Sequence, residues 1–559
     1  MKVVALFGLT GQGIETAGEI LSAILQEQGR AFRTWRDFST IIRGGYTSYE
    51  IYLTEEKEEI PPPRLQTVDL AVVWDDEGAA RYLPRLRDND LLFGPSESKL
   101  VPIENQEKSP KLGFNVWALG IAAGYIGLPY EQVRKALESR FSDKSNLLLL
   151  DNGYKRGGTK NNGSIINKSD VEYVTLSGND ALSLSAVSGG VRHYFGYPIT
   201  PASEILEYLS KWLPSLGGRA YQVEDEIAAI HAAVGASFAG KRTFVATSGP
   251  GLSLMTEGMS YIGATEIPLV IVDNQRGGPS TGMPTKTEQS DLFHLYYSGH
   301  GEFSRILLTP TGVLDCLLVM QEALNLADYY QCPVIIALDL DLALRRISVP
   351  WYLVEDSLRS VAIDRGPTLI ESPPLQEYKR YESIEGQPPI RTTPGIKGGA
   401  YVASGDEHDE RGWMEPDFQK VRHTLHQRRL HKADQIDYNR PFTVVGNPKA
   451  TTAIIGTGSL GELIEAIVRR NPEEFCGILL RQLCPLPEYE LSEILSGVGK
   501  IVVAEYNARG QIRFFLEPVL KDKNASSLLR FDGEHYTLEE FETAIRDSVN
   551  NITTTVFID

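Results

Sequence analysis

The sequence predicts an α/β protein built from several doubly wound domains with parallel sheets. At the start, the strand-like run VVALF leads into a glycine-rich turn and then into the amphipathic stretch 14–29. In the middle, the apolar runs 242–248 and 268–275 each end in a glycine- or proline-rich turn. Near the end, residues 451–470 repeat the order of strand, glycine turn and helix. Such alternation is typical of parallel sheets covered by helices.

Composition shifts divide the chain into four expected segments. Residues 1–175, 176–345 and 441–559 each show the α/β alternation. Residues 346–440 are instead crowded with prolines and charges and show little apolar periodicity. We expect this third segment to be a linker, a lid or an interface segment.

Length, charge and cysteine usage limit the classes of function. The chain has 559 residues with 42% hydrophobic and 23% charged residues, as in ordinary globular proteins, and its net charge is −18. That charge argues against nucleic acid or an anionic membrane as a general partner. The four cysteines, with no C-x-x-C spacing, favour a cytoplasmic protein without its own zinc ribbon or four-cysteine iron–sulfur centre. The first apolar run is too short for a signal peptide, and no run is long enough to span a bilayer.

The glycine turn Gly8–Gly13 allows two interpretations. A turn between strand and helix offers backbone N–H groups to a phosphate or another anion. Its spacing, G-x-x-G-x-G, is not the dinucleotide-binding fingerprint, so a tight turn without a ligand is favoured over a nucleotide-like ligand.

Two other stretches point to chemistry. In GYPITPASEIL, residues 196–206, prolines stiffen a loop and fix the position of the Thr200 hydroxyl. In residues 223–251, Glu226 begins a helix rich in small residues, which resembles the pyrimidine-binding half of thiamine diphosphate enzymes. There a carboxylate bonds the aminopyrimidine N1′ and promotes loss of the thiazolium C2 proton. The alternative is a surface glutamate favoured by the helix dipole.

Several motifs in order resemble the α subunit of 2-oxoacid:ferredoxin oxidoreductases over essentially the whole chain. They are GNDALSLSAVSGG (178–190), YPITP (197–201), QRGGPSTGMPTKTEQSDL (275–292), TTPGIKGGAYVASGDEHDERG (392–412), CPLP (484–487) and EYNARGQ (505–511). The segments 392–412 and 284–292 resemble the 2-oxoglutarate-type members most. The resemblance implies a γ-like α/β domain fused ahead of a thiamine-enzyme pyrimidine-type domain, followed by a transketolase C-terminal-like domain.

The resemblance also implies roles for individual residues. Glu226 matches the glutamate that activates thiamine, and Thr200 matches the threonine that contacts the substrate carboxylate and the cofactor. Arg276 matches the arginine that pairs with the C1 carboxylate of the oxoacid, and its fork suits a carboxylate. Lys286 is the expected extra cation for a distal carboxylate; the alternative for both cations is a solvated loop residue. The remaining residues expected near the cofactor are Tyr197, Pro198 and Ile199.

The resemblance further implies a reaction and a partner. The oxoacid is decarboxylated on thiamine diphosphate, electrons pass through a cluster to ferredoxin, and the acyl group goes to coenzyme A; the reverse is reductive carboxylation. The chain lacks a G-D-G…N segment and cluster cysteines, and Gly405–Glu407 belongs to the GDEH loop rather than to a metal site. A β subunit is therefore expected to supply Mg²⁺, the diphosphate site and a [4Fe–4S] cluster, in a dimer of αβ heterodimers.

Three alternatives remain at this point. The same reaction could act on pyruvate or on a broad range of 2-oxoacids. A complete thiamine decarboxylase or transketolase in one chain is disfavoured by the missing diphosphate motif. A non-catalytic nucleotide-binding scaffold would leave the set of Thr200, Glu226 and Arg276 unexplained.

Overall fold

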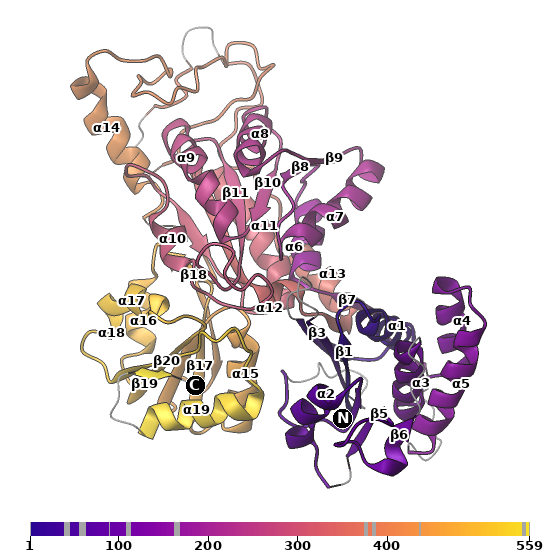
Figure 1. Ribbon diagram of the computed structural model, residues 1–559. Coiled ribbons are helices and arrows are strands. Elements are labelled where there is room, and N and C mark those ends of the chain that lie inside the picture. The colour runs from indigo at the N-terminus through magenta and orange to yellow at the C-terminus, as the bar shows by residue number, and fades with distance from the viewer. Residues whose placement is uncertain are drawn as a thin grey trace. The chain divides into compact units, whose positions relative to one another are not determined.

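The chain was analysed as a computed structural model (Figure 1). The structure describes residues 2–38, 45–54, 63–88, 90–107, 113–160, 168–373, 378–382, 387–434, 436, 438–550 and 555–557. These residues form two compact units. The first comprises residues 1–177, 345–355 and 536–541, and the second comprises 178–344, 356–535 and 542–559.

The first unit is built on a mixed eight-stranded sheet. Its strands, in spatial order, are β6 (Gln106–Glu107), β5 (Leu91–Pro95), β4 (Leu70–Val73), β1 (Lys2–Leu9), β3 (Tyr46–Leu53), β2 (Phe32–Phe38), β14 (Ile347–Pro350) and β7 (Tyr173–Leu176). β1, β4, β5 and β6 run parallel, as the strand–turn–helix pattern predicts. β3 pairs antiparallel with both β1 and β2, so this sheet is only partly parallel.

Helices of the first unit pack unusually closely where glycines face each other. The helices are α1 (Ile14–Glu27), α2 (Asp76–Tyr82), α3 (Phe114–Ile126), α4 (Tyr130–Arg140) and α5 (Ser145–Gly158). A Cβ at Gly124 of α3 would lie 2.2 Å from the carbonyl oxygen of Tyr154, and one at Gly157 of α5 would lie 2.1 Å from that of Ile121. Only glycine permits this approach of the two backbones, which run side by side in Figure 1.

The second unit contains the predicted parallel sheet of the middle segment. Its strands, in spatial order, are β10 (Phe244–Thr247), β11 (Leu269–Gln275), β13 (Pro333–Asp339), β12 (Ile306–Leu308) and β18 (Gln482–Cys484). The first four are parallel, and β18 joins the edge antiparallel. A separate parallel pair is formed by β8 (His193–Gly196) and β9 (Arg219–Gln222). The helices of this part are α6 (Gly178–Ser188), α7 (Ser203–Trp212), α8 (Glu226–Phe238), α9 (Gly249–Thr265), α10 (Leu292–Tyr297), α11 (Val313–Tyr330) and α12 (Leu340–Leu344).

A third sheet belongs to the same unit. Its strands, in spatial order, are β15 (Phe442–Gly446), β17 (Phe475–Leu480), β16 (Thr452–Gly456), β19 (Lys500–Glu505), β20 (Ala525–Leu529) and β21 (Thr555–Phe557). All pairs are parallel except β15 with β17. β16 and α15 (Leu460–Arg470) form the strand, glycine turn and helix predicted for residues 451–470. The other helices are α16 (Glu488–Ile494), α17 (Gln511–Phe515), α18 (Glu517–Leu520) and α19 (Leu538–Asn550).

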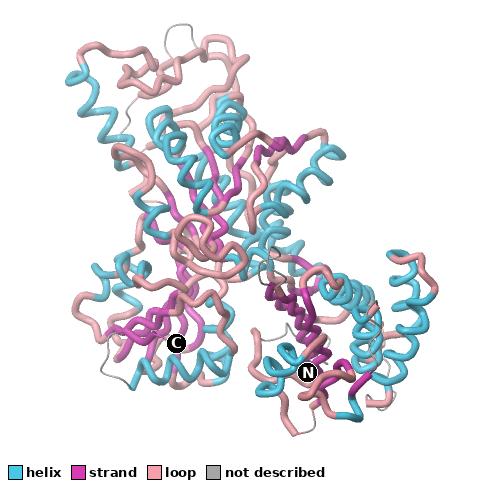
Figure 2. The backbone as a smooth tube through the Cα atoms, in the orientation of Figure 1, coloured by secondary structure: helices cyan, strands magenta, loops and turns pink. Residues whose placement is uncertain are grey.

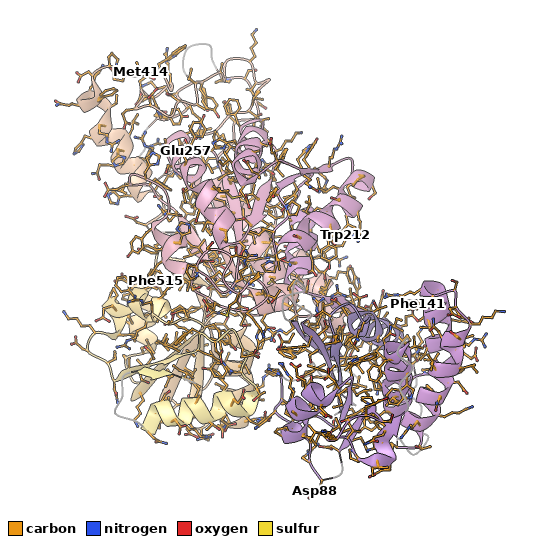
Figure 3. All side chains as sticks on the ribbon, in the orientation of Figure 1. Asp88, Phe141, Trp212, Glu257, Met414 and Phe515 are labelled. Carbon is orange, nitrogen blue, oxygen red and sulfur yellow. The ribbon has the colours of Figure 1, made fainter. Side chains whose placement is uncertain are left out.

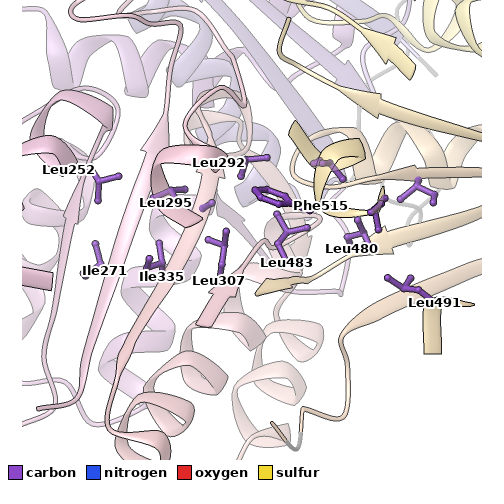
Figure 4. Close-up of a cluster of buried hydrophobic side chains, with 14 of the residues drawn as sticks. Leu252, Ile271, Leu292, Leu295, Leu307, Ile335, Leu480, Leu483, Leu491 and Phe515 are labelled. Atoms are coloured by element: carbon purple, nitrogen blue, oxygen red, sulfur yellow. The ribbon is translucent and has the colours of Figure 1, made fainter. Parts of the chain in front are cut away.

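One hydrophobic cluster joins the last two sheets (Figure 4). It extends from Ile271 and Ile335 through Leu307 to Leu483 and Leu491, all fully buried or nearly so. Burial of apolar surface contributes about 25 cal/mol per Å². This shared core explains why the middle and C-terminal sheets form a single compact unit.

Residues 361–417 contain neither helix nor strand in their described part, which appears as loop in Figure 2. They lie between α13 (Trp351–Ser360) and α14 (Phe418–His431). Residues 422–432, which are rich in basic side chains, therefore form most of the helix α14. The expected division into four segments and the expected linker role stay predictions. None of the described helices combines the length and apolar composition needed to cross a membrane.

Candidate active site

The loop that carries Thr200 connects β8 to α7 and is held at its base by buried amides. Nδ2 of Asn179, on α6, donates a 2.9 Å hydrogen bond to the carbonyl oxygen of Pro201. Oδ1 of Asn179 accepts a 2.8 Å hydrogen bond from Nδ2 of Asn274, on β11. The Thr200 side chain is exposed. The protein thus fixes the backbone of this loop and leaves the hydroxyl open to a ligand.

The residues that precede Thr200 lie at the surface of the same loop. Tyr197 is 40% exposed, Pro198 is exposed and Ile199 is half-buried. An exposed aromatic ring beside a proline is suited to cover a bound molecule. Their contact with a cofactor stays a prediction.

Arg276 directly follows β11 and is buried, with 9% of its surface exposed. Its Nη1 donates a 2.7 Å hydrogen bond to the carbonyl oxygen of Thr200, which brings together two of the predicted site residues. Its Nε has no hydrogen-bond partner, and Arg276 takes part in no ion pair within the described part of the chain. Burial lowers the pKa of Arg276, while the charges of Asp291 and Asp273 oppose that shift. A buried guanidinium with free donors is well suited to an anionic ligand.

Glu226 is the first residue of α8 and is 5% exposed. The preceding Asp225 caps the helix by accepting a 2.7 Å hydrogen bond from the Ala228 N–H. The Glu226 carboxylate lies against the first turn of α9, where a Cβ at Gly251 would be 2.4 Å from Oε1. Among the described residues, none donates a hydrogen bond to this carboxylate. Glu226 is therefore not the solvated surface residue of the alternative interpretation.

Residues 277–286 form a closed loop directly after Arg276. The Gly277 N–H donates to the Lys286 carbonyl at 3.0 Å, and the Met283 N–H donates to the Gly277 carbonyl at 2.8 Å. The Lys286 backbone thus returns to the neighbourhood of Arg276. Its ammonium group, however, forms an ion pair with Glu534, with 2.7 Å between Nζ and Oε1. The predicted role of Lys286 toward a substrate requires that a substrate carboxylate compete with Glu534.

The segment that follows this loop is clamped by the C-terminal sheet. Gln289 accepts a 3.2 Å hydrogen bond at Oε1 from the Tyr506 N–H, and its own N–H donates to the Tyr506 carbonyl at 2.6 Å. Its Nε2 donates to Asp339 at 2.9 Å. Asn507 Nδ2 donates to the Gln289 carbonyl at 3.2 Å. Sequence reasoning placed EYNARGQ and PTKTEQSDL in one motif series but did not foresee that the two segments bind each other.

Sequence reasoning also missed two acids whose charges act on Arg276. Asp273 lies on β11 and is fully buried, and Asp291 lies at the start of α10. The one available signal for Asp273 was a carboxylate within the apolar run LVIVDNQ, because an acid in a buried strand needs a reason. Asp291 lay inside a quoted motif without an assigned role.

The residues around Glu226 fit the aminopyrimidine part of thiamine diphosphate. A buried carboxylate without a donor among the described residues can accept a hydrogen bond from a protonated ring nitrogen, and the glycine at position 251 lets this carboxylate lie close against the first turn of α9. Within the described ranges, no group of three or more His, Cys, Asp or Glu side chains is arranged to hold a metal ion.

Two family descriptions match the chain. "Pyruvate flavodoxin/ferredoxin oxidoreductase, thiamine diP-bdg" matches residues 185–425. "Pyruvate ferredoxin/flavodoxin oxidoreductase" matches residues 3–156. These matches point to the class of thiamine diphosphate-binding oxidoreductases.

Known relatives identify the family more closely. Subunit alpha of 2-oxoacid:ferredoxin oxidoreductase 1 from Aeropyrum pernix is 30% identical, and the alignment covers 98% of each chain. The corresponding subunit from Sulfurisphaera tokodaii is 32% identical over 96% of each chain. The 2-oxoglutarate synthase subunit KorA from Methanothermobacter thermautotrophicus is 33% identical over 65% of this chain and 96% of its own length. The chain belongs to the 2-oxoacid:ferredoxin oxidoreductases, as an alpha subunit with a thiamine-binding domain.

A solved structure shares the complete fold. It is the 2-oxoglutarate:ferredoxin oxidoreductase from Magnetococcus marinus, described with 2-oxoglutarate, coenzyme A and succinyl-CoA bound. It is 26% identical with a TM-score of 0.83, and the match covers 98% of this chain and 99% of that one. The predicted α/β fold class and the predicted family are confirmed.

Proposed function

We propose that this chain is the α subunit of an enzyme that converts 2-oxoglutarate, coenzyme A and oxidised ferredoxin to succinyl-CoA, CO₂ and reduced ferredoxin, or catalyses the reverse reaction. The names of the KorA relative and of the Magnetococcus marinus enzyme support 2-oxoglutarate. The archaeal relatives named only for 2-oxoacids support a second candidate, a broad 2-oxoacid specificity.

The observation that carries the proposal is Arg276, a buried guanidinium without an ion-pair partner among the described residues. Its backbone contact with Thr200 places it beside an exposed hydroxyl. In this proposal the guanidinium binds the C1 carboxylate of the oxoacid, and the Thr200 hydroxyl donates to the same group. A charge-assisted contact of this kind is strong only where water is excluded, as burial provides.

Glu226 prepares the cofactor in this proposal. When bound, thiamine diphosphate supplies the electron sink that stabilises the carbanion left by decarboxylation. Glu226 holds the pyrimidine ring and keeps a proton at its N1′ atom. Tyr197, Pro198 and Ile199 cover the cofactor from the exposed loop.

A β subunit completes the enzyme. Because the chain has four cysteines and no suitable metal cluster in its described part, we assign Mg²⁺, the diphosphate site and a [4Fe–4S] cluster to that subunit. Two αβ heterodimers pair in this proposal. The relatives named as α subunits are consistent with such a partner.

The test uses the chain co-expressed with its β subunit. Viologen reduction dependent on coenzyme A is measured with 2-oxoglutarate, pyruvate and 2-oxobutyrate. We expect the highest kcat/KM with 2-oxoglutarate. Arg276→Gln should raise the KM for every 2-oxoacid, because each carries a C1 carboxylate. A normal KM in this variant would refute the assigned role of Arg276, and similar kcat/KM values for all three acids would support the broad-specificity candidate.

A further inference from the structure

The loop that carries Thr200 is bound at two successive carbonyl groups by side chains of other elements. Nη1 of Arg276 donates a 2.7 Å hydrogen bond to the carbonyl oxygen of Thr200. Nδ2 of Asn179, on α6, donates a 2.9 Å hydrogen bond to the carbonyl oxygen of Pro201. The loop then leads into α7, which ends at Trp212 (Figure 3). These two donors therefore help to set the position of the Thr200 hydroxyl.

Both donors are connected to the same strand. Arg276 directly follows β11, and Asn274 lies on β11 two residues earlier. Nδ2 of Asn274 donates a 2.8 Å hydrogen bond to Oδ1 of Asn179. β11 thus holds the loop in two ways. It acts directly through Arg276 and indirectly through the amide pair that Asn274 and Asn179 form.

Stability alone does not account for this amide pair. Asn179 and Asn274 are fully buried, and Oδ1 of Asn274 has no hydrogen-bond partner within the described residues. Burying an unpaired polar atom costs free energy, whereas an apolar pair of the same shape would avoid that cost. Nδ2 of Asn179 also lies 3.4 Å from Oε2 of Glu204, a long contact that adds little. What the pair supplies is a fixed donor to the carbonyl group of Pro201.

We propose that Asn179 and Asn274 are positioning residues for the carboxylate of the 2-oxoacid. The proposal rests on the proposed roles of Thr200 and Arg276. A hydroxyl and a guanidinium bind one carboxylate together only when their donors converge to hydrogen-bond distance, about 2.5–3.2 Å, from its oxygens. The amide pair holds the loop so that the Thr200 hydroxyl keeps this spacing from the guanidinium. Neither amide touches the substrate.

The amide pair acts on substrate binding rather than on the chemical step. The C1 carboxylate carries its full charge in the bound substrate and loses that charge as CO₂ departs. Contacts with this group are therefore strongest before decarboxylation. Displacing the Thr200 hydroxyl weakens ground-state binding, which raises the KM for the oxoacid and leaves kcat nearly unchanged. Coenzyme A carries no 2-oxoacid carboxylate, so its KM should not change.

The experiment measures kcat and KM of the proposed αβ enzyme for 2-oxoglutarate and for coenzyme A. Asn179→Leu keeps the shape of the side chain but removes the donor to Pro201. The KM for 2-oxoglutarate should rise about tenfold or more, because small displacements of binding groups are costly. Asn274→Leu removes only the hydrogen bond to Asn179 and should raise the same KM less. Ser185→Ala is the matched control, since Ser185 is a buried residue of the same helix whose hydroxyl donates to the Leu317 carbonyl on α11.

An unchanged KM for 2-oxoglutarate in a folded Asn179→Leu variant would refute the proposal, and Asn274→Leu decides in the same way if the first variant does not fold. A fall of kcat alone, equal rises of KM for both substrates, or the same rise in Ser185→Ala would show that the amides serve only the packing of α6. Arg276→Gln separates the two levels. A raised KM in that variant together with an unchanged KM in Asn179→Leu would refute only the positioning role, whereas a normal KM in Arg276→Gln would refute the proposed function itself.

Discussion

The segment 361–434 and the candidate active site both contain buried charges, but they differ in how those charges are paired. Asp328 of α11 binds Arg365 and Arg391 of the segment, and also Arg242, at 2.8–2.9 Å. In the active site, the buried Arg276 has no ion pair among the described residues, and Asp273 has no hydrogen-bond partner.

A second buried acid that binds cations of the segment shows the same contrast. Glu266, at the end of α9, binds Arg428 and Lys432 of the helix α14 region. Burial opposes its ionisation, but Lys432, Arg428 and Arg380 outweigh burial and lower the pKa of Glu266 to about 2. Paired charges thus hold a segment whose described residues are mostly outside helices and strands. Charges left unpaired indicate where a ligand is to complete the structure.

The largest expected effect concerns Glu226. Glu226→Gln removes the negative charge beside the proposed pyrimidine site, and kcat of the proposed αβ enzyme should fall by about 10²–10⁴-fold, the usual size of a general acid–base contribution. The αβ complex should still assemble, as size-exclusion chromatography can show. Activity near that of the wild type would mean that another carboxylate, first of all Glu224, has this role.

The next largest effect is expected on the stability of the protein when Asp328 is replaced. Asp328→Asn leaves the buried Arg242 and Arg391 without their anion, so the free energy of unfolding should fall by about 3–5 kcal/mol. Denaturant titration measures this loss, and kcat per folded molecule should stay unchanged. Asp356→Asn, at an exposed position of α13, is the control. If Asp328→Asn is as stable as the wild type but less active, Asp328 serves activity rather than stability. The distinction between the two regions would then be wrong.

A smaller effect is expected at Lys286, the predicted site residue whose side chain forms an ion pair. If its cation serves the distal carboxylate of 2-oxoglutarate, Lys286→Ala should raise the KM for that substrate roughly tenfold and leave pyruvate nearly unchanged. Glu534→Gln removes the ion pair with Lys286 and should not raise the KM. Equal losses for both acids, or the same loss in Glu534→Gln, would show that the ion pair serves only the architecture.

The smallest expected effect is on acid stability. The folded-state pKa of Glu266 lies below its unfolded value, so its contribution to stability is complete above about pH 4.5 and is lost as the pH falls through about 2. As the pH falls through this range, the melting temperature of the wild type should fall. In Glu266→Gln, this fall should be smaller by a few degrees. If the melting temperatures of the wild type and of Glu266→Gln depend on pH in the same way, the neighbouring cations do not keep Glu266 ionised.

The strand, turn and helix patterns could be predicted because they are local. The glycine turn after VVALF does separate β1 from α1, and residues 451–470 do form β16 and α15. Pairings between strands that lie far apart in the sequence could not be predicted. β14 joins β7 in the first unit, and β18 joins β12 in the second, although each is short and carries no periodic signal.

The site was predictable to the extent that its residues lie in distinctive motifs. Thr200 and Arg276 were each placed in the site through such a motif, and the structure brings them into contact. Asp273 lies in no such motif, and whether a buried acid has a partner depends on neighbours supplied by other strands. The pairing of Lys286 with Glu534, 248 residues later, was hidden for the same reason.

The hydrogen bonds that hold Gln289 have a consequence for how the chain folds during its synthesis on the ribosome. Its hydrogen bonds with Tyr506 and Asn507 span 217 and 218 residues. Gln289 therefore lacks these two partners until more than two hundred further residues have been synthesised. At about 5–20 residues per second, this delay lasts roughly ten seconds or more. The parallel sheet beneath can form early, but the segment that carries Asp291 is completed only near the end of translation.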